Sequence, residues 1–157
     1  MSMRVVVDAD VLGRERTGDE TYVRNLLREL VPLADGANVR LAAVTRRPEL
    51  VPAGVEAVEL PARFQELRMA WSVPRVLRDL RPALAHFQHA LPLRCPVPAV
   101  VTIHDLSFER DPSVMPLHDR LVFKTVVPRS ARRAALVLAV SKRTKSDIVE
   151  LYAIPPE

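Results

Sequence analysis

The chain has 157 residues and a mass of 17.6 kDa, the size of one globular domain. Apolar residues make up 48% of it and charged residues 27%, which excludes a wholly disordered protein. The single cysteine, Cys95, excludes an internal disulfide framework and a four-cysteine metal site. No apolar run approaches the roughly 20 residues of a membrane-spanning helix, and residues 1–4 do not begin a signal peptide. We therefore expect a cytoplasmic protein.

The balance of charge is basic. There are 23 Lys and Arg residues against 19 Asp and Glu residues, a formal net charge of +4 with a pI of about 9.8. Twenty of the 23 basic residues are scattered arginines and only seven residues are aromatic, so we expect no nucleic-acid partner. An anionic partner suits this charge, either a phosphate-bearing ligand or an acidic membrane surface. A solvated arginine-rich surface is the structural alternative.

The first predicted elements are a strand and a helix. Residues 4–8 read RVVVD, a β-branched run typical of a strand buried on both faces. Apolar residues then recur at positions 22, 23, 26, 27, 30 and 31, which predicts an amphipathic helix. Thr17 or Asp19 can cap the start of this helix, and Asp35 with Gly36 ends it.

The same alternation continues along the chain. Further strands are predicted at 39–44, 55–60, 84–87, 98–103 and 136–140, and further helices over 62–80, 117–134 and 142–152. Pro74 is expected to break or restart its helix with Ser72 as the new cap, Pro128 to interrupt or kink the next, and Ser141 to cap the last. This order predicts an α/β domain with a mostly parallel sheet of about six strands, covered on both faces.

Ligands of such sheets bind beyond the carboxyl ends of the strands. Gly18 lies in the first of these loops, just before a predicted helix, where backbone N–H groups can hold a phosphate. The loop has neither the G-x-G-x-x-G spacing nor a Gly-Lys-Ser/Thr sequence, and Asp19 and Glu20 would repel an anion. Simple helix capping is therefore the alternative to phosphate contact.

Histidines follow two other predicted strands. His86, Gln88 and His89 come at the end of one strand, and His104 with Asp105 directly after the next. No carboxylate–histidine motif joins them, which disfavours a zinc site. His104 is placed either to act in a cleft or to bond loop backbone as a structural histidine. The chain has no G-x-S-x-G nucleophile elbow, and no motif links Cys95 to a base, so nucleophilic hydrolysis is not expected.

The predicted helix at 117–134 is basic. An acidic lipid surface or an anionic acceptor could approach it, and a solvated outer face is the alternative. Its basic residues are Arg120, Lys124, Arg129, Arg132 and Arg133.

Four stretches occur in order along the chain: RTGDETYVRNLL (16–27), HFQHALPL (86–93), VVTIHDLSF (100–108) and AVSK (139–142). Together they resemble the N-terminal half of the group 1 glycosyltransferases (family four), which have the two-domain GT-B architecture. The resemblance implies a Rossmann-like three-layer domain over residues 1–157. It implies transfer of a sugar from a nucleotide-sugar to an acceptor with retained anomeric configuration, with neither a metal nor another cofactor.

On this resemblance the N-terminal domain largely holds the acceptor, and a second domain holds most of the nucleotide-sugar and the acidic catalytic motif. We assign the cleft histidine to His104, and substrate binding to Gly18, Asp19, His89, Asp105 and Ser141. The chain departs from the family at Asp19 and Glu20, where many members have a second glycine. It also has Ala83, Ala135 and Lys142 where members often carry acidic residues.

The chain stops where members continue into a last strand and the second domain, so we expect it to be inactive alone. Contact with the inner face of a membrane and a homodimer through the uncharged strand LVLAV (136–140) are further expectations. Two alternatives stay open. One is a stand-alone, non-catalytic binding module of the same fold. The other is a small α/β enzyme that uses His104 and Asp105 and is completed by oligomerisation.

Overall fold

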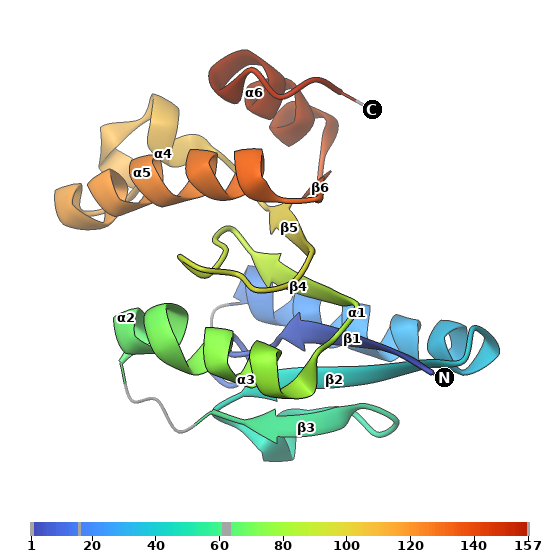
Figure 1. Ribbon diagram of the computed structural model, residues 1–157. Coiled ribbons are helices and arrows are strands. Elements are labelled where there is room, and N and C mark those ends of the chain that lie inside the picture. The colour runs from blue at the N-terminus through green and yellow to red at the C-terminus, as the bar shows by residue number, and fades with distance from the viewer. Residues whose placement is uncertain (1, 16, 61–63, 157) are drawn as a thin grey trace. The chain divides into compact units, whose positions relative to one another are not determined.

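The computed structural model describes residues 2–15, 17–60 and 64–156, which form two compact units. Unit 1 consists of Met1–His86 and Pro92–Pro98, and unit 2 of Phe87–Leu91 and Ala99–Glu157. Each unit combines parallel strands with helices packed against them (Figure 1).

The strands belong to one six-stranded sheet with the order β3-β2-β1-β4-β5-β6. In unit 1, β1 pairs in parallel with β2 and β4, and β2 with β3; in unit 2, β5 pairs in parallel with β6. The strands are β1 (Met3–Asp8), β2 (Val39–Thr45), β3 (Glu56–Glu59), β4 (Leu84–Gln88), β5 (Ala99–Ile103) and β6 (Leu136–Ala139). The predicted α/β class and parallel sheet are confirmed.

The described residues form six α-helices, of which five lie between strands and α6 follows β6. They are α1 (Thr17–Gly36), α2 (Gln65–Leu67), α3 (Val73–Leu80), α4 (Ser107–Arg110), α5 (Leu117–Arg133) and α6 (Lys142–Tyr152). Short helical turns lie at Pro48–Leu50, Arg68–Ser72 and Pro112–Val114. No helix among the described residues is long and apolar enough to cross a membrane.

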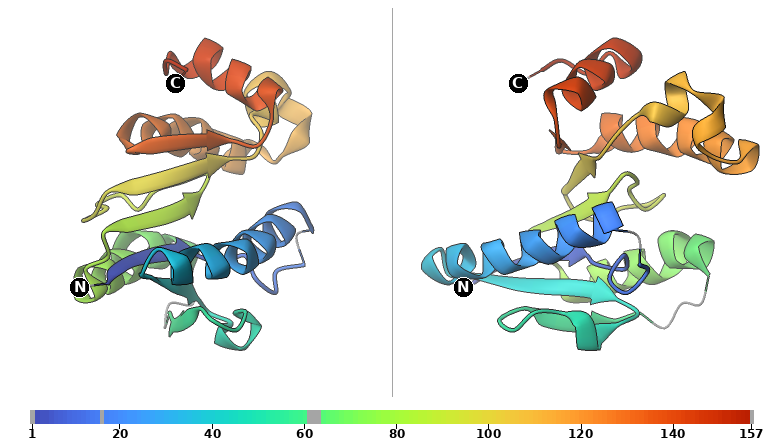
Figure 2. Two further views of the ribbon diagram at one scale, coloured as in Figure 1. Left: turned by 90° about the vertical axis from the view of Figure 1, so that its right-hand side faces the viewer. Right: turned by 180° about the vertical axis from the view of Figure 1, so that it is seen from behind.

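In unit 1, α1 and α3 lie on opposite faces of β1 and β2 (Figures 1 and 2). Because successive strand residues point to opposite faces, Val7 and Ala43 reach the α1 side, where they join Val23 and Leu27 in one apolar cluster. Leu27 is fully buried, and burying a leucine side chain contributes roughly 1.5–3 kcal/mol. The apolar stripe predicted from the sequence is therefore the face that holds α1 on the sheet.

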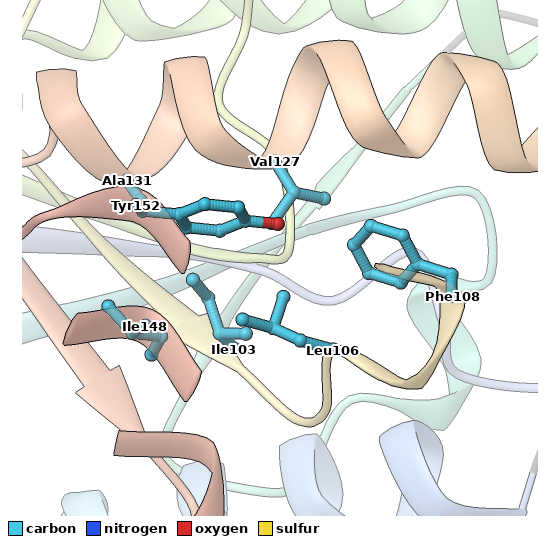
Figure 3. Packing of buried hydrophobic residues seen from close by; sticks show 7 residues of the cluster. All are labelled: Ile103, Leu106, Phe108, Val127, Ala131, Ile148 and Tyr152. Atoms are coloured by element: carbon cyan, nitrogen blue, oxygen red, sulfur yellow. The ribbon is translucent and has the colours of Figure 1, made fainter. Parts of the chain in front are cut away.

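In unit 2, an apolar cluster joins the strand β5 to three helices (Figure 3). Ile103 of β5 is completely buried beside Val127 of α5 and Ile148 of α6, and Phe108 of α4 packs edge-on against Phe123. All five residues of β5 are buried, as expected for a parallel strand that is covered on both faces.

The segment before β4 differs from its prediction. We expected Ser72 to cap a helix that restarts at Pro74, but Ser72 is helical itself and its side chain makes no capping hydrogen bond. Instead the chain forms a π-helical turn, Arg68–Ser72, in which the Val73 N–H bonds the Arg68 carbonyl. Proline clashes with the carbonyl four residues earlier in a regular helix, and a wider turn relieves that clash. Part of the predicted range 62–80 lies outside the described residues.

The ends of α1 differ in detail as well. The helix begins at Thr17, so Asp19 lies in its first turn and not at the capping position, which lies outside the described residues. At the other end the helix ends at Gly36, as predicted, and Asn38 adopts the left-handed conformation with φ 53°. Asn tolerates that conformation better than most residues do. In unit 2, α5 continues through Pro128 without interruption.

Candidate functional site

The predicted histidines of unit 2 come together where β4 and β5 end. His104 directly follows β5, and the N–H of His89, just after β4, donates to the Thr102 carbonyl at 2.8 Å. The rings of His89 and His104 lie 5.0 Å apart between centroids, tilted by 41°. The carboxyl ends of parallel strands are where ligands of such sheets bind, so this pair is the candidate site of unit 2.

Polar contacts with Gln88 and Thr144 hold His104. Its ring Nε2 lies 2.9 Å from the amide oxygen of Gln88, and its backbone carbonyl accepts a hydrogen bond of 3.0 Å from the Thr144 hydroxyl. The residue is partly exposed. Both ring and backbone are therefore fixed while the imidazole keeps access to solvent, which is what a residue that contacts a ligand requires.

His89 occupies a tight turn. Its φ is 58°, in the left-handed region, and the Ala90 N–H bonds the Gln88 carbonyl across it at 2.6 Å. The ring also lies 5.9 Å from the ring of Phe123. Such a conformation costs a residue with a side chain of the order of 1–3 kcal/mol, and strained residues cluster at functional sites. No signal in the sequence indicated this strain.

Asp105 fastens the loop that follows His104. Its Oδ1 accepts hydrogen bonds from the Ser107 N–H, at 2.9 Å, and from the Ser107 hydroxyl, and this leads into α4. Burial raises the pKa of Asp105. The Ser107 hydrogen bonds and the neighbouring rings of His89 and His104 lower it by more, so the net pKa is below its ordinary value. Asp105 is therefore a loop anchor in this structure.

Ser141 caps α6, as predicted: its Oγ accepts from the Thr144 N–H at 3.0 Å. The same Thr144 carries the hydroxyl that bonds the His104 carbonyl, and it lies 2.9 Å from Ser141 Oγ. The start of α6 is thus tied to the histidine loop. Sequence reasoning missed Thr144, although its position three residues after the cap placed it near the helix start.

In unit 1, Gly18 and Asp19 lie in the first turn of α1. A Cβ added at Gly18 would meet no atom within 4 Å, so nothing in the described chain requires glycine there. Glu20 accepts hydrogen bonds from the Arg24 guanidinium, at 2.6 Å, and from the Glu15 N–H, at 3.2 Å. Hydrogen bonding by the Gly13 backbone, then Arg24 and Glu15, lowers the pKa of Glu20. Glu20 therefore stays ionised, and its charge is paired with the Arg24 guanidinium.

The structure adds an ion cluster that sequence reasoning missed, at the end of β1. Asp10 accepts both Nε and Nη2 of Arg46 at 2.7 Å, and Asp8 accepts both terminal nitrogens of Arg68, at 2.8 and 3.1 Å. Arg68 is only 3% exposed, because the π-helical turn directs it inward. Arg14 also donates to Asp10. The two arginines lie 36 and 60 residues from their aspartate partners, so no local sequence pattern could indicate these pairs. The cluster joins the end of β1 and the turn after it to the helical segment before β4.

Known proteins show the following similarities to this chain. A family model described as Glycosyltransferase Family 4 matches residues 16–157. Among solved structures, the chain is similar to a short-chain dehydrogenase/reductase from Burkholderia vietnamiensis, with a TM-score of 0.46 and 13% identity, covering 99% of this chain and 93% of that one. A search of curated proteins finds no match.

Proposed function

Because this chain belongs to glycosyltransferase family 4, we propose that it is the N-terminal, acceptor-side domain of a GT-B enzyme that moves a sugar from a nucleotide-sugar to an acceptor with retention of configuration. The family match over residues 16–157 carries this proposal. In this proposal a second domain, outside residues 1–157, would hold most of the nucleotide-sugar. The chain alone is therefore inactive in this proposal.

His104 is the proposed residue close to the transferred sugar. Its partly exposed imidazole lies at a carboxyl end of the sheet and is held by Gln88 and by Thr144. An imidazole fixed in this way can donate or accept a hydrogen bond to a sugar hydroxyl without first losing side-chain freedom. The ring of His89 would line the same site. Asp105 and Ser141 would contribute by holding the loops beside it.

Gly18 is the proposed contact with the donor phosphates, and Asp19 beside it is proposed to bind the substrate. The open space at Gly18 and the start of a 20-residue helix support this assignment, because backbone N–H groups at a helix start attract anions. The pairing of Glu20 with Arg24 supports it further.

We also propose that α5 contacts an anionic membrane surface peripherally and that the chain binds its acceptor there. On α5, Leu117 is 69% exposed, Leu121 58% and Val122 45%, beside the basic residues of the same helix. An exposed apolar stripe with flanking arginines suits the boundary of an acidic bilayer. Co-sedimentation with anionic vesicles, against vesicles of neutral lipid, tests this part alone.

Two measurements test the main proposal. Calorimetry of the chain with UDP- and GDP-sugars should detect nothing tighter than about 1 mM, a free energy near −4 kcal/mol. Micromolar binding would favour the small enzyme completed by oligomerisation. In the complete enzyme, His104→Ala should lower kcat/KM by about 100-fold or more, while Asn25→Ala, an exposed change on α1, should leave it unchanged. Equal activity of the two variants would exclude a role for His104 at the transferred sugar.

A further inference from the structure

The side chain of Gln88 contacts the ring of His104, the residue proposed to lie close to the transferred sugar. Gln88 is the last residue of β4 and His104 follows β5, so the two side chains meet at the carboxyl ends of these strands. The amide oxygen Oε1 lies 2.9 Å from His104 Nε2. The amide nitrogen of Gln88 is buried and has no hydrogen-bond partner among the described residues.

This orientation defines the protonation of the ring nitrogen. An amide oxygen can only accept, so this contact pairs with the His104 tautomer that carries its proton on Nε2. The same bond persists when the ring is charged, because both ring nitrogens then donate. A buried amide nitrogen without a partner is costly, of the order of 1–3 kcal/mol. The amide is therefore kept against a cost to stability, which is typical of a side chain that serves a site.

We propose that Gln88 is a positioning residue for His104: it holds the imidazole in one orientation with Nε2 protonated. The proposal rests on the proposed role of His104 at the sugar. Gln88 thus deepens the proposed site by one residue, which contacts His104 directly.

Neighbouring groups in unit 2 do not replace this contact. The carboxylate of Asp105 is engaged by Ser107, and the His89 ring lies 5.0 Å from the His104 ring, a packing distance. The charge of Asp105 interacts with the His104 ring, while Gln88 makes the 2.9 Å contact with Nε2. Replacement of Gln88 alone therefore isolates the effect of that contact.

The test is a histidine-ring NMR titration of the full chain. Gln88→Leu should lose the protected Nε2–H signal of His104 and lower its pKa, because the acceptor for the protonated ring is gone. Gln88→Glu keeps the acceptor, so the Nε2–H signal should persist. The added negative charge should raise the pKa of His104, which is a fall of its acid dissociation constant by about tenfold or more. His118, exposed on α5, is an internal reference in every sample, and Asn25→Leu on α1 is the matched amide-to-leucine control.

An unchanged Nε2–H signal and pKa in Gln88→Leu would overturn the proposal. Should Gln88→Leu unfold, the comparison of wild type with Gln88→Glu decides. A higher His104 pKa in Gln88→Glu, with the Nε2–H signal retained, supports the proposal, and an unchanged pKa overturns it. In the complete enzyme, Gln88→Leu should lower kcat about tenfold or more and Gln88→Glu should restore part of it. If the NMR changes appear while His104→Ala leaves activity intact, the positioning stands and the proposed role of His104 fails.

Discussion

At the scale of single residues, His89 holds a backbone conformation that glycine adopts without cost. Its φ of 58° places a β-carbon close to the following carbonyl, at roughly 1–2 kcal/mol for a residue with a side chain. The turn nevertheless directs the ring onto that of His104. The strain can be separated from the loss of the ring by comparing two substitutions.

We expect His89→Gly to be more stable than His89→Ala by about 1 kcal/mol, because both lose the ring and only glycine relieves the strain. Urea unfolding of the two variants measures the difference. The same pair at Ser146, an exposed position within α6, should show the opposite order, with alanine more stable by about 1 kcal/mol. Alanine more stable than glycine at position 89 would contradict the assigned strain.

Gly18 offers a second test at this scale. Gly18→Ala should raise the free energy of unfolding by about 0.5 kcal/mol, since alanine favours a helix and its Cβ would enter open space. Gly54→Ala is the control and should destabilise, because φ is 87° there and the Cβ would lie 2.8 Å from Val31 Cγ1. In the complete enzyme, the stabilised Gly18→Ala variant should bind nucleotide-sugar more weakly. Unchanged affinity would remove Gly18 from the donor site.

At the scale of elements, α6 is joined to α4 through one buried carboxylate. Asp147 accepts Nη2 of Arg110, from α4, at 2.8 Å on one oxygen, and Nε of Arg143, one turn earlier in α6, at 3.1 Å on the other. Burial raises the pKa of Asp147, but hydrogen bonds and charge from Arg110 and Arg143 lower it more, so the net pKa lies below its ordinary value. The link between the helices therefore depends on pH.

Asp147→Asn should lower the free energy of unfolding at pH 7. Since the carboxyl pKa is lower in the folded chain than the value of about 3.9 in the unfolded chain, its stabilisation is complete above about pH 5 and is lost as the pH falls through the folded pKa. The gap between wild type and variant should thus be wide at pH 7 and narrow toward pH 2, as read by urea unfolding at several pH values. Asp119→Asn, an exposed change on α5, should leave stability within about 0.5 kcal/mol at pH 7. A gap that does not depend on pH would refute the ion pair as its cause.

At the scale of the whole molecule, β6 lies at one edge of the sheet. β6 is the last strand in the sheet order, and Leu136, Leu138 and Val140 are 43%, 37% and 47% exposed. A hollow of about 630 Å³ lies beside it, lined by β6, α6 and the segment 153–156. An uncharged, apolar edge strand presents unpaired backbone groups to another chain.

We therefore expect the chain to self-associate through β6. Sedimentation at two concentrations should show a mass above 17.6 kDa that rises with concentration. Leu138→Lys should reduce the association, because it places a charge on the edge, whereas Leu33→Lys on α1, at a position that is 68% exposed, should not. A 17.6 kDa monomer at high concentration would mean that the edge is protected.

The amino-acid sequence alone determined the elements and the class of the fold. Hydrophobic periods of two and of 3.6 residues depend only on near neighbours, so the strands and the long helices were predicted within a few residues at their ends. The cap of α6 was predicted for the same reason, since Ser141 and Thr144 lie three residues apart. The four stretches that resemble group 1 glycosyltransferases also led to the family that the match over residues 16–157 confirms.

Only the tertiary structure decided which distant side chains meet. The bond between Gln88 and His104 depends on two adjacent strands ending together, and that between Asp8 and Arg68 on a π-helical turn 60 residues away. The strain at His89 is likewise imposed by contacts around the turn, and the sequence around it contains no glycine to mark it. Local propensity acts over about four residues, whereas these contacts depend on strand order and side-chain direction, which exist only once the sheet has formed.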